Sequence, residues 1–252
     1  TRRSSDLPSP SSERPLIVGL GGSAGALSAL TSFFDALPEQ PDEAFVVVVH
    51  MPADRESELD EILSAHTEMP VQEVTEPTTL RANHVYVAPP GRALTVEDDT
   101  LTPVEFTQPQ GRRTPIDQLF RSLAQNGAST VGVVLSGTGS DGTVGLRAIE
   151  EAGGLVAAQD PAEAEYDSMP RSAVEMGRID LVLPVAELAE RIYNQRTLLD
   201  QLALSPAPDD DQDRNRHLLQ DILELVRART GHDFSEYKQS TMLRRVQRRM
   251  QV

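Results

Sequence analysis

The chain has 252 residues and a formal net charge of −16 at pH 7, with 38% hydrophobic residues, 4% aromatic residues and no cysteine. Disulfides, thiolate nucleophiles and zinc–cysteine sites are therefore excluded, and the core is expected to be aliphatic. The charge is uneven, because residues 213–252 hold nine basic and five acidic side chains, whereas residues 1–212 hold 14 basic and 34 acidic ones. A net of −20 over residues 1–212 excludes nucleic acid as an expected partner, since its phosphates would be repelled.

The first 13 residues are polar and contain several Ser and Pro. They lack the apolar stretch of a signal peptide and predict a disordered N-terminus. No apolar run in the chain reaches the roughly 18 residues that a membrane-spanning helix needs. The sequence therefore predicts a cytoplasmic protein without membrane insertion.

Residues 15–25, with the sequence PLIVGLGGSAG, predict a strand, a tight turn and the start of a helix. Glycines let the chain turn sharply and let other atoms approach the backbone, and a helix-like stretch follows at residues 26–37. This order opens a βαβ unit. Ser23 would lie where the unpaired N–H groups of a helix favour negative charge, either as a helix N-cap or as a nucleophile beside an oxyanion site.

Strands and helices alternate along the rest of the main region. Apolar, β-branched runs suited to parallel strands buried on both faces occur at residues 44–50, 84–88 and 130–135. Shorter strands are predicted at residues 71–74, 155–158 and 179–183, an antiparallel hairpin at 93–96 and 100–104, and helices at 56–66, 114–123, 143–152, 169–176 and 185–203. The alternation predicts an α/β fold with a doubly wound, mostly parallel sheet, helices on both faces and a β-hairpin.

The composition changes after this region. Residues 204–213, which include SPAPDDD, predict a linker. Residues 214–252 predict a small all-helical segment with an amphipathic helix and a basic end. The main domain is therefore expected over residues 14–203.

Three polar residues follow predicted parallel strands: Ser23, His50 and Asp141. Such sheets collect functional groups at the carboxyl ends of their strands. A serine becomes a useful nucleophile when a base removes its proton and a carboxylate orients that base. Taken singly, Ser23 or Asp141 could cap a helix and His50 could be a hydrogen-bonded core histidine, but together they predict a Ser-His-Asp hydrolase. No spacing of His, Asp and Glu indicates a metal site, and no cofactor is expected.

Two other classes of function stay open at this point. Gly19, Gly21 and Ala24 fit a loose dinucleotide-binding fingerprint, but the acidic residue expected at the end of the second strand is replaced by His50. The alternatives are thus a nucleotide-binding Rossmann-like module and a catalytically silent signalling or interaction domain.

Residues 16–192 resemble the catalytic domain of the chemotaxis protein-glutamate methylesterase family (CheB). The resemblance rests on ordered matches, which are GGSAG at 21–25, VHM at 49–51, HVYVAPP at 84–90, LSGTGSDG at 135–142, GG at 153–154, AQDP at 158–161 and SMP at 168–170. It implies hydrolysis of glutamate γ-methyl esters on chemoreceptor helices, with glutamine deamidation as a related activity. It also implies Ser23 as nucleophile, His50 as base and Asp141 as the acid that orients it.

Four further site residues are expected from this resemblance and from position. Backbone N–H groups near Ala24 and Thr138 are candidates for the oxyanion site, and Thr138 stands where the family often has Met. Arg112 and Arg113, in a loop before a helix, are possible contacts to an acidic receptor surface.

The tail, from residue 218 onward, is similar to the N-terminal helical region of the chemotaxis methyltransferase family (CheR). TGHDF at residues 230–234 and LRRVQRRM at residues 243–250 carry this similarity. It implies a fusion of esterase and methyltransferase in which only the start of the methyltransferase is present. S-adenosylmethionine binding and control by a receiver domain are therefore not expected.

Overall fold

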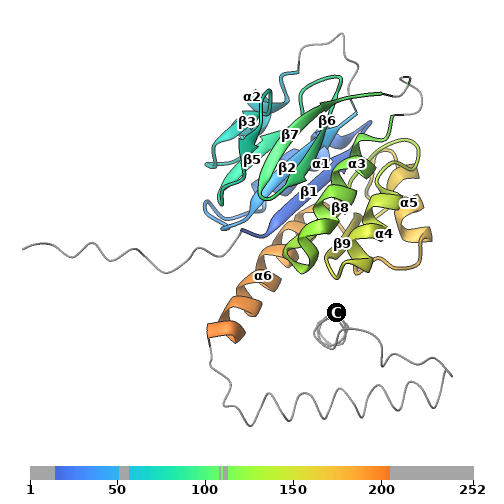
Figure 1. Ribbon diagram of the computed structural model, residues 1–252. Helices are drawn as coiled ribbons and strands as arrows, with labels where there is room; N and C mark the ends of the chain where they lie inside the picture. The colour runs from blue at the N-terminus through green and yellow to red at the C-terminus, as the bar shows by residue number, and fades with distance from the viewer. Residues whose placement is uncertain (1–14, 51–56, 108, 110–112, 205–252) are drawn as a thin grey trace, which may run out of the picture.

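The computed structural model describes residues 15–50, 57–107, 109 and 113–204 of the chain. Its centre is a seven-stranded sheet in the order β10-β9-β8-β1-β2-β5-β3, in which all neighbouring strands run parallel (Figure 1). A second sheet has three antiparallel strands in the order β4-β7-β6. The predicted α/β class with a mostly parallel sheet and a hairpin is confirmed. The predicted linker and helical tail lie outside the described residues.

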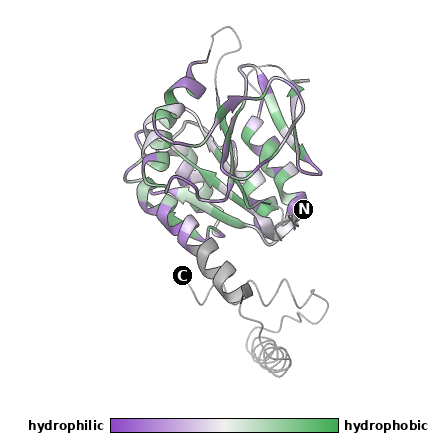
Figure 2. Cartoon of the chain, turned by 90° about the vertical axis from the view of Figure 1, so that its left-hand side faces the viewer, coloured by the Kyte–Doolittle hydropathy of each residue, from purple (hydrophilic) through white to green (hydrophobic). Residues whose placement is uncertain are grey.

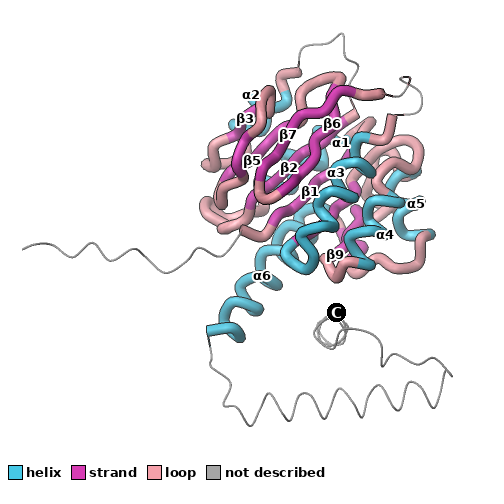
Figure 3. The backbone as a smooth tube through the Cα atoms, viewed as in Figure 1, coloured by secondary structure: helices cyan, strands magenta, loops and turns pink. Residues whose placement is uncertain are grey.

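The large sheet consists of β1 Ile17–Gly22, β2 Ala44–Val49, β3 Val71–Glu73, β5 His84–Val87, β8 Thr130–Val134, β9 Leu155–Gln159 and β10 Leu181–Leu183. The small sheet consists of β4 Thr78–Thr79, β6 Arg92–Glu97 and β7 Thr100–Glu105. The helices are α1 Ala26–Asp35, α2 Leu59–Ser64, α3 Pro115–Leu123, α4 Thr143–Glu151, α5 Ser168–Glu175 and α6 Val185–Leu204, with a 3-10 segment η2 at Ala124–Ser129 (Figure 3).

Strand β1 lies at the point where the strand order reverses. It pairs with β2 on one side and with β8, which comes much later in the chain, on the other. Gly22 is in register with Val49, and Gly21 with Val134, so the three strands end at nearly the same level. Open α/β sheets bind ligands beyond the carboxyl ends of the strands at such a point. The residues that follow β1, β2 and β8 are therefore the candidates for a functional site.

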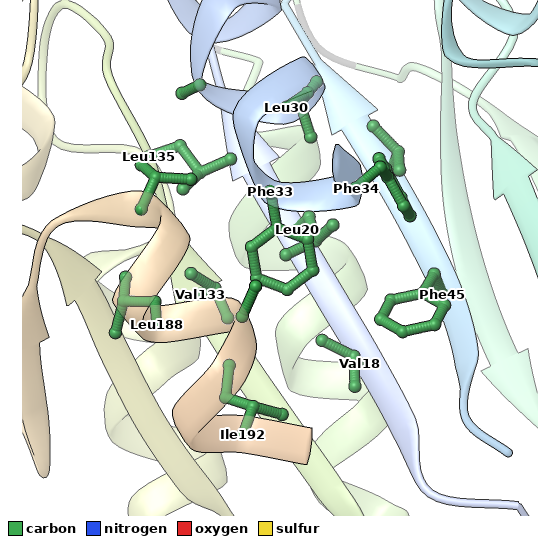
Figure 4. Close-up of a cluster of buried hydrophobic side chains, with 14 of the residues drawn as sticks. Val18, Leu20, Leu30, Phe33, Phe34, Phe45, Val133, Leu135, Leu188 and Ile192 are labelled. Atoms are coloured by element: carbon green, nitrogen blue, oxygen red, sulfur yellow. The ribbon is translucent and has the colours of Figure 1, made fainter. Parts of the chain in front are cut away.

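Helices cover both faces of the sheet and create two aliphatic cores. On one face, α1, α2 and α6 pack on the sheet, and Phe33 and Phe34 of α1 meet Phe45 of β2 edge to face (Figure 4). Leu188 and Ile192 of α6 complete this core. On the other face lie α3, α4, α5 and the hairpin β6–β7. Hydrophobic residues accordingly concentrate in the central strands and their flanking helices (Figure 2).

The glycines inside β1 allow helix α3 to approach the strand closely. A Cβ atom added at Gly21 would lie 2.3 Å from Cγ2 of Ile116, and one added at Gly19 would lie 2.7 Å from Cδ1 of Leu123. Both distances are far shorter than van der Waals contact, so neither position has room for a side chain. Helix packing thus accounts for the two glycines that suggested a dinucleotide fingerprint.

Replacing Gly21 with alanine is expected to lower the free energy of unfolding by about 1–3 kcal/mol, because the new methyl group overpacks the contact with Ile116. Urea denaturation of the two proteins measures this difference. Ser28→Ala, on the exposed side of α1, is the control and should change the stability by no more than about 0.5 kcal/mol. A Gly21→Ala protein as stable as the wild type would contradict the packing explanation.

Some boundaries differ from the predicted ones. Strand β1 continues to Gly22 and so includes two of the glycines that the sequence predicts at the turn. Helix α2 starts at Leu59, later than the predicted residue 56, which lies outside the described part. Strand β4 at Thr78–Thr79 was not predicted. It forms by antiparallel pairing with β7. Two polar residues have no pattern in their own sequence from which this long-range pairing could be predicted.

Candidate active site

The three predicted site residues lie at the ends of the three central strands. Ser23 follows β1 directly, His50 follows β2 directly, and Asp141 lies in the loop between β8 and α4. Backbone hydrogen bonds hold these segments together: the Ser23 N–H donates to the Ser136 carbonyl at 3.0 Å, and the His50 N–H donates to the Gly22 carbonyl at 3.1 Å. The structure therefore brings the predicted serine, histidine and aspartate to one edge of the sheet.

His50 and Asp141 form a direct side-chain hydrogen bond. The distance between His50 Nε2 and Asp141 Oδ2 is 2.6 Å. The His50 side chain is 29% exposed, whereas that of Asp141 is only 6% exposed. The imidazole is thus accessible from outside while the carboxylate beneath it is buried, and the ring nitrogen that remains for a substrate or for Ser23 is Nδ1.

Backbone amides hold the Asp141 carboxylate in place. Oδ2 accepts a hydrogen bond from the Ile116 N–H at 3.0 Å, while Oδ1 accepts from the Asp117 N–H at 2.9 Å and from the Gly142 N–H at 2.8 Å. The first two donors belong to the first turn of α3, where the helix dipole and unpaired N–H groups favour an anion. These hydrogen bonds fix the positions of the two carboxylate oxygens. They therefore also fix the orientation of the His50 ring that bonds to Oδ2.

Ser23 is not the N-cap of α1, so the capping interpretation was wrong for this residue. The N-cap is Gly25, in the left-handed region at φ +72, and no side chain caps the helix. The glycine is needed because a Cβ there would also lie 2.7 Å from Oγ of Ser136. Within the described part of the chain, the Ser23 hydroxyl makes no hydrogen bond, so none joins it to His50.

Asp141 does not cap α4 either. The N-cap of that helix is Gly142, at φ +95, and it has no side-chain cap of its own. The side chain of Asp141 turns instead toward His50 and the start of α3. The capping alternative was therefore wrong for this aspartate too.

A polar network beside Ser23 was missed by sequence reasoning. The Ser136 N–H donates to Gln159 Oε1 at 2.8 Å, Gln159 Nε2 donates to Glu163 Oε2 at 2.9 Å, and Ser136 Oγ donates to the Ala24 carbonyl at 2.9 Å. Ser136 and Gln159 are buried. Because the Ser136 carbonyl also accepts a hydrogen bond from the Ser23 N–H, the network fixes the backbone that carries Ser23. The AQDP stretch at residues 158–161 was its one sequence signal.

Asp117 is a second missed residue. Its buried side chain accepts hydrogen bonds from the Gly142 and Gly145 N–H groups, next to the Asp141 carboxylate. Burial raises the pKa of the Asp117 carboxyl, with the Gly145 hydrogen bond opposing and the Asp141 charge adding to the shift. In the sequence it is one acidic residue in the first turn of a helix, a common place for aspartate.

Of the four remaining predicted residues, Ala24, Thr138 and Arg113 belong to the described part of the chain. Ala24 is half-buried beside Ser23, and Thr138 is exposed. Thr138 follows Gly137, where an added Cβ would lie 3.0 Å from Ser23 Cβ. The Arg113 guanidinium lies 4.8 Å from the ring centroid of Phe106, a cation–π contact. Arg112 lies outside the described residues.

Two other histidines and a cavity lie away from this edge. His66 bonds Asp35 at 2.8 Å, and His84 stacks on Tyr86. A cavity of about 680 Å³ lies at the opposite edge, around the start of β5, and is lined by Glu39, Gln40, Glu68, Met69, Pro70, Asn83 and His84. No group of three or more His, Asp or Glu side chains among the described residues is arranged to hold a metal ion. No described helix has the length and apolar character needed to cross a membrane.

A parallel α/β sheet with Ser23 at its switch point and a hydrogen-bonded His50–Asp141 pair at the ends of the neighbouring strands carries the three residue types that serine hydrolases use. The family model described as CheB methylesterase matches residues 18–192. The chain therefore belongs to the CheB methylesterase family. A second family model, the all-alpha domain of CheR methyltransferase, matches residues 217–252.

The chain is similar to two curated proteins, of which one is a named methylesterase. The Moorella thermoacetica protein-glutamate methylesterase/protein-glutamine glutaminase is 37% identical over 182 residues, which are 70% of this chain and 43% of that protein. An uncharacterized 104.1 kDa protein of Rhodobacter capsulatus is 37% identical over 214 residues, 76% of this chain and 22% of that protein. The chain thus spans less than half the length of either relative.

A solved structure has the same fold. The crystal structure of the Thermotoga maritima CheB methylesterase catalytic domain matches with a TM-score of 0.67 at 27% sequence identity. The match covers 72% of this chain and 99% of that domain. The match therefore spans almost the whole of that domain.

Proposed function

We propose that this chain hydrolyses glutamate γ-methyl esters on chemoreceptor helices, using Ser23 as nucleophile, and that it also deamidates glutamine side chains. The observation that carries the proposal is the 2.6 Å hydrogen bond between His50 and the buried Asp141, at the strand edge that bears Ser23. Membership of the CheB methylesterase family supports the reaction, and the name of the Moorella relative supports the pair of activities.

In the proposed reaction, the Ser23 hydroxyl attacks the ester carbonyl and His50 takes its proton. Since Nε2 bonds Asp141, Nδ1 is the ring nitrogen that receives it. Asp141 orients the ring and stabilises the imidazolium without taking the proton itself. The tetrahedral intermediate then breaks its bond to methoxide, which His50 protonates to give methanol.

Water completes the cycle. It attacks the acyl-enzyme, His50 accepts one proton from it, and the returning proton releases Ser23 and a glutamate side chain. Glutamine would follow the same steps with ammonia in place of methanol as the leaving group. No step requires a metal or an organic cofactor.

We assign the oxyanion site to the backbone N–H groups of Ala24 and Thr138. Support comes from the neighbouring amides, because the N–H of Ser23 is already bonded to Ser136 and that of Gly137 to the Tyr166 carbonyl. Loss of one such donor raises the barrier by about 3 kcal/mol in comparable sites.

The proposed partner is a methylated chemoreceptor helix, met in the cytoplasm. Arg112 and Arg113 are the side chains we assign to an acidic receptor surface, because they interrupt a strongly acidic main region. The domain boundaries are part of the same proposal: an N-terminal stretch at 1–13, an esterase domain at 14–203, a linker at 204–213 and a methyltransferase-like segment at 214–252. The CheR match at residues 217–252 supports the last of these.

A fluorophosphonate that labels activated serines tests the proposal directly. We expect one adduct, located on Ser23 by peptide mass spectrometry, and loss of methanol release in proportion to labelling. The His50→Ala protein should label far more slowly, because its serine lacks a base. An enzyme that releases methanol normally after complete labelling elsewhere, or with no adduct at all, would overturn the assignment of Ser23.

A further inference from the structure

Helices α3 and α4 begin side by side, and each supplies hydrogen-bonding groups to the other. The Asp117 N–H in the first turn of α3 donates to Asp141 Oδ1 at 2.9 Å. In return, Asp117 Oδ1 accepts from the Gly142 N–H at 3.0 Å and the Gly145 N–H at 2.7 Å at the start of α4. Each aspartate side chain thus accepts hydrogen bonds from backbone N–H groups of the segment that carries the other aspartate.

The Asp117 side chain acts as the missing cap of α4. A capping side chain normally accepts from an N–H in the first turn of its own helix, but the N-cap here is Gly142, which has no side chain. Gly145, in the first turn, donates to Asp117 of the neighbouring helix instead. A Cβ at Gly145 would lie 2.5 Å from Phe120 Cβ, so the two helices are in close contact at this point.

We propose that Asp117 is a positioning residue for the esterase reaction: by capping α4 from α3, it fixes the Gly142 turn and so holds the Asp141 carboxylate against His50. The inference rests on the proposed function, since it concerns the same reaction. Asp117 is 5% exposed and does not reach the surface where substrate arrives. It acts through Asp141 and does not touch the reacting atoms.

The two carboxylates are near each other because both accept from the Gly142 N–H. The other charged group that affects the Asp117 carboxyl is Arg121, one turn later in α3. An ionised carboxylate at such a buried site is costly, and a neutral asparagine could accept the same two N–H bonds through its own Oδ1. Substitution at this position therefore separates the hydrogen-bonding role from the charge.

Asp117→Ala removes the cap, whereas Asp117→Asn retains an acceptor in the same place. We expect kcat for methanol release to fall about 10–100-fold in Asp117→Ala with little change in KM, because a small displacement of a catalytic group costs up to about 100-fold. Asp117→Asn should stay within about threefold of the wild type on the same scale.

Asp180→Ala is the matched control. Asp180 also accepts a backbone N–H, that of Val156 at 3.0 Å, but it lies at the opposite edge of the sheet, before β10. Its removal should lower stability without lowering kcat for methanol release. An equal loss of kcat in Asp180→Ala would show that destabilisation alone explains the effect and would overturn the positioning role.

Equal losses in Asp117→Ala and Asp117→Asn would also overturn it, because the charge would then matter and the cap would not. If Asp117→Ala does not fold, Asp117→Asn still decides: a folded protein with a more than tenfold loss contradicts the proposal. Fluorophosphonate labelling separates this test from that of the proposed function. A wild type that is not labelled at Ser23 refutes the esterase, whereas Asp117→Ala labelled as fast as the wild type refutes only the role of Asp117.

Discussion

The Ser23→Ala protein is expected to release no measurable methanol from methylated chemoreceptor while keeping its fold. Loss of the nucleophile in serine hydrolases lowers kcat by a factor on the order of 10⁶. Folding should be unaffected, because the Ser23 hydroxyl makes no hydrogen bond within the described part of the chain, and the bond from its N–H to Ser136 does not depend on the side chain. Methanol release and urea denaturation measured on the same preparation test both halves of this expectation.

Ser32→Ala, an exposed position on α1, serves as the matched serine control and should retain full activity. The stability of both variants should lie within about 0.5 kcal/mol of the wild type. Methanol release by Ser23→Ala at the rate of the control would rule out the covalent mechanism. A Ser23→Ala protein that is inactive but also unfolded would show instead that the side chain has a structural role.

The second large effect is expected for Asp141→Asn, with kcat reduced about 10⁴-fold, the size seen when an asparagine replaces the aspartate of a serine hydrolase. Both carboxylate oxygens accept from donors, Oδ2 from His50 and Ile116 and Oδ1 from Asp117 and Gly142. The NH₂ group of asparagine must face one of these pairs. It either forces His50 into the wrong tautomer or breaks backbone bonds at the start of α3 and α4.

Single-turnover labelling of Ser23 by a fluorophosphonate measures this effect without a protein substrate, and methanol release should decrease in parallel. Asp35→Asn is a close control, since Asp35 also bonds a histidine, His66, at 2.8 Å, but on the exposed surface away from the site. Such exposed pairs contribute about 0–1 kcal/mol, so activity should not change. An Asp141→Asn protein as active as this control would remove Asp141 from the mechanism.

The sequence was most informative about the reactive side chains that directly follow predicted strands. Ser23, His50 and Asp141 were placed at one edge of a parallel sheet, because each follows an apolar run whose direction is set by the strand–helix alternation. The bond between His50 and Asp141 confirms that two of the three meet. The catalytic roles themselves remain predictions that the variants above test.

What the sequence did not show depends on contacts between distant segments. Asp117 looks like an ordinary first-turn acid until α3 and α4 are brought together, and the Gln159–Ser136 bond joins two strand ends 23 residues apart. Gly19 and Gly21 suggested dinucleotide binding, but the structure shows that they leave room for helix α3 to pack closely on β1. Local periodicity carries no information about any of these pairings, since each is decided by which elements become neighbours.

The order in which the central strands leave the ribosome has a consequence for biosynthesis. Strand β1 finds β2 early, but its other neighbour, β8, is synthesised more than 100 residues later. Until then a nascent chain exposes one unpaired, apolar edge of β1, which is a site for aggregation and for chaperone capture. Because Asp141 follows β8, the growing polypeptide also lacks the His50–Asp141 pair until that strand has been synthesised.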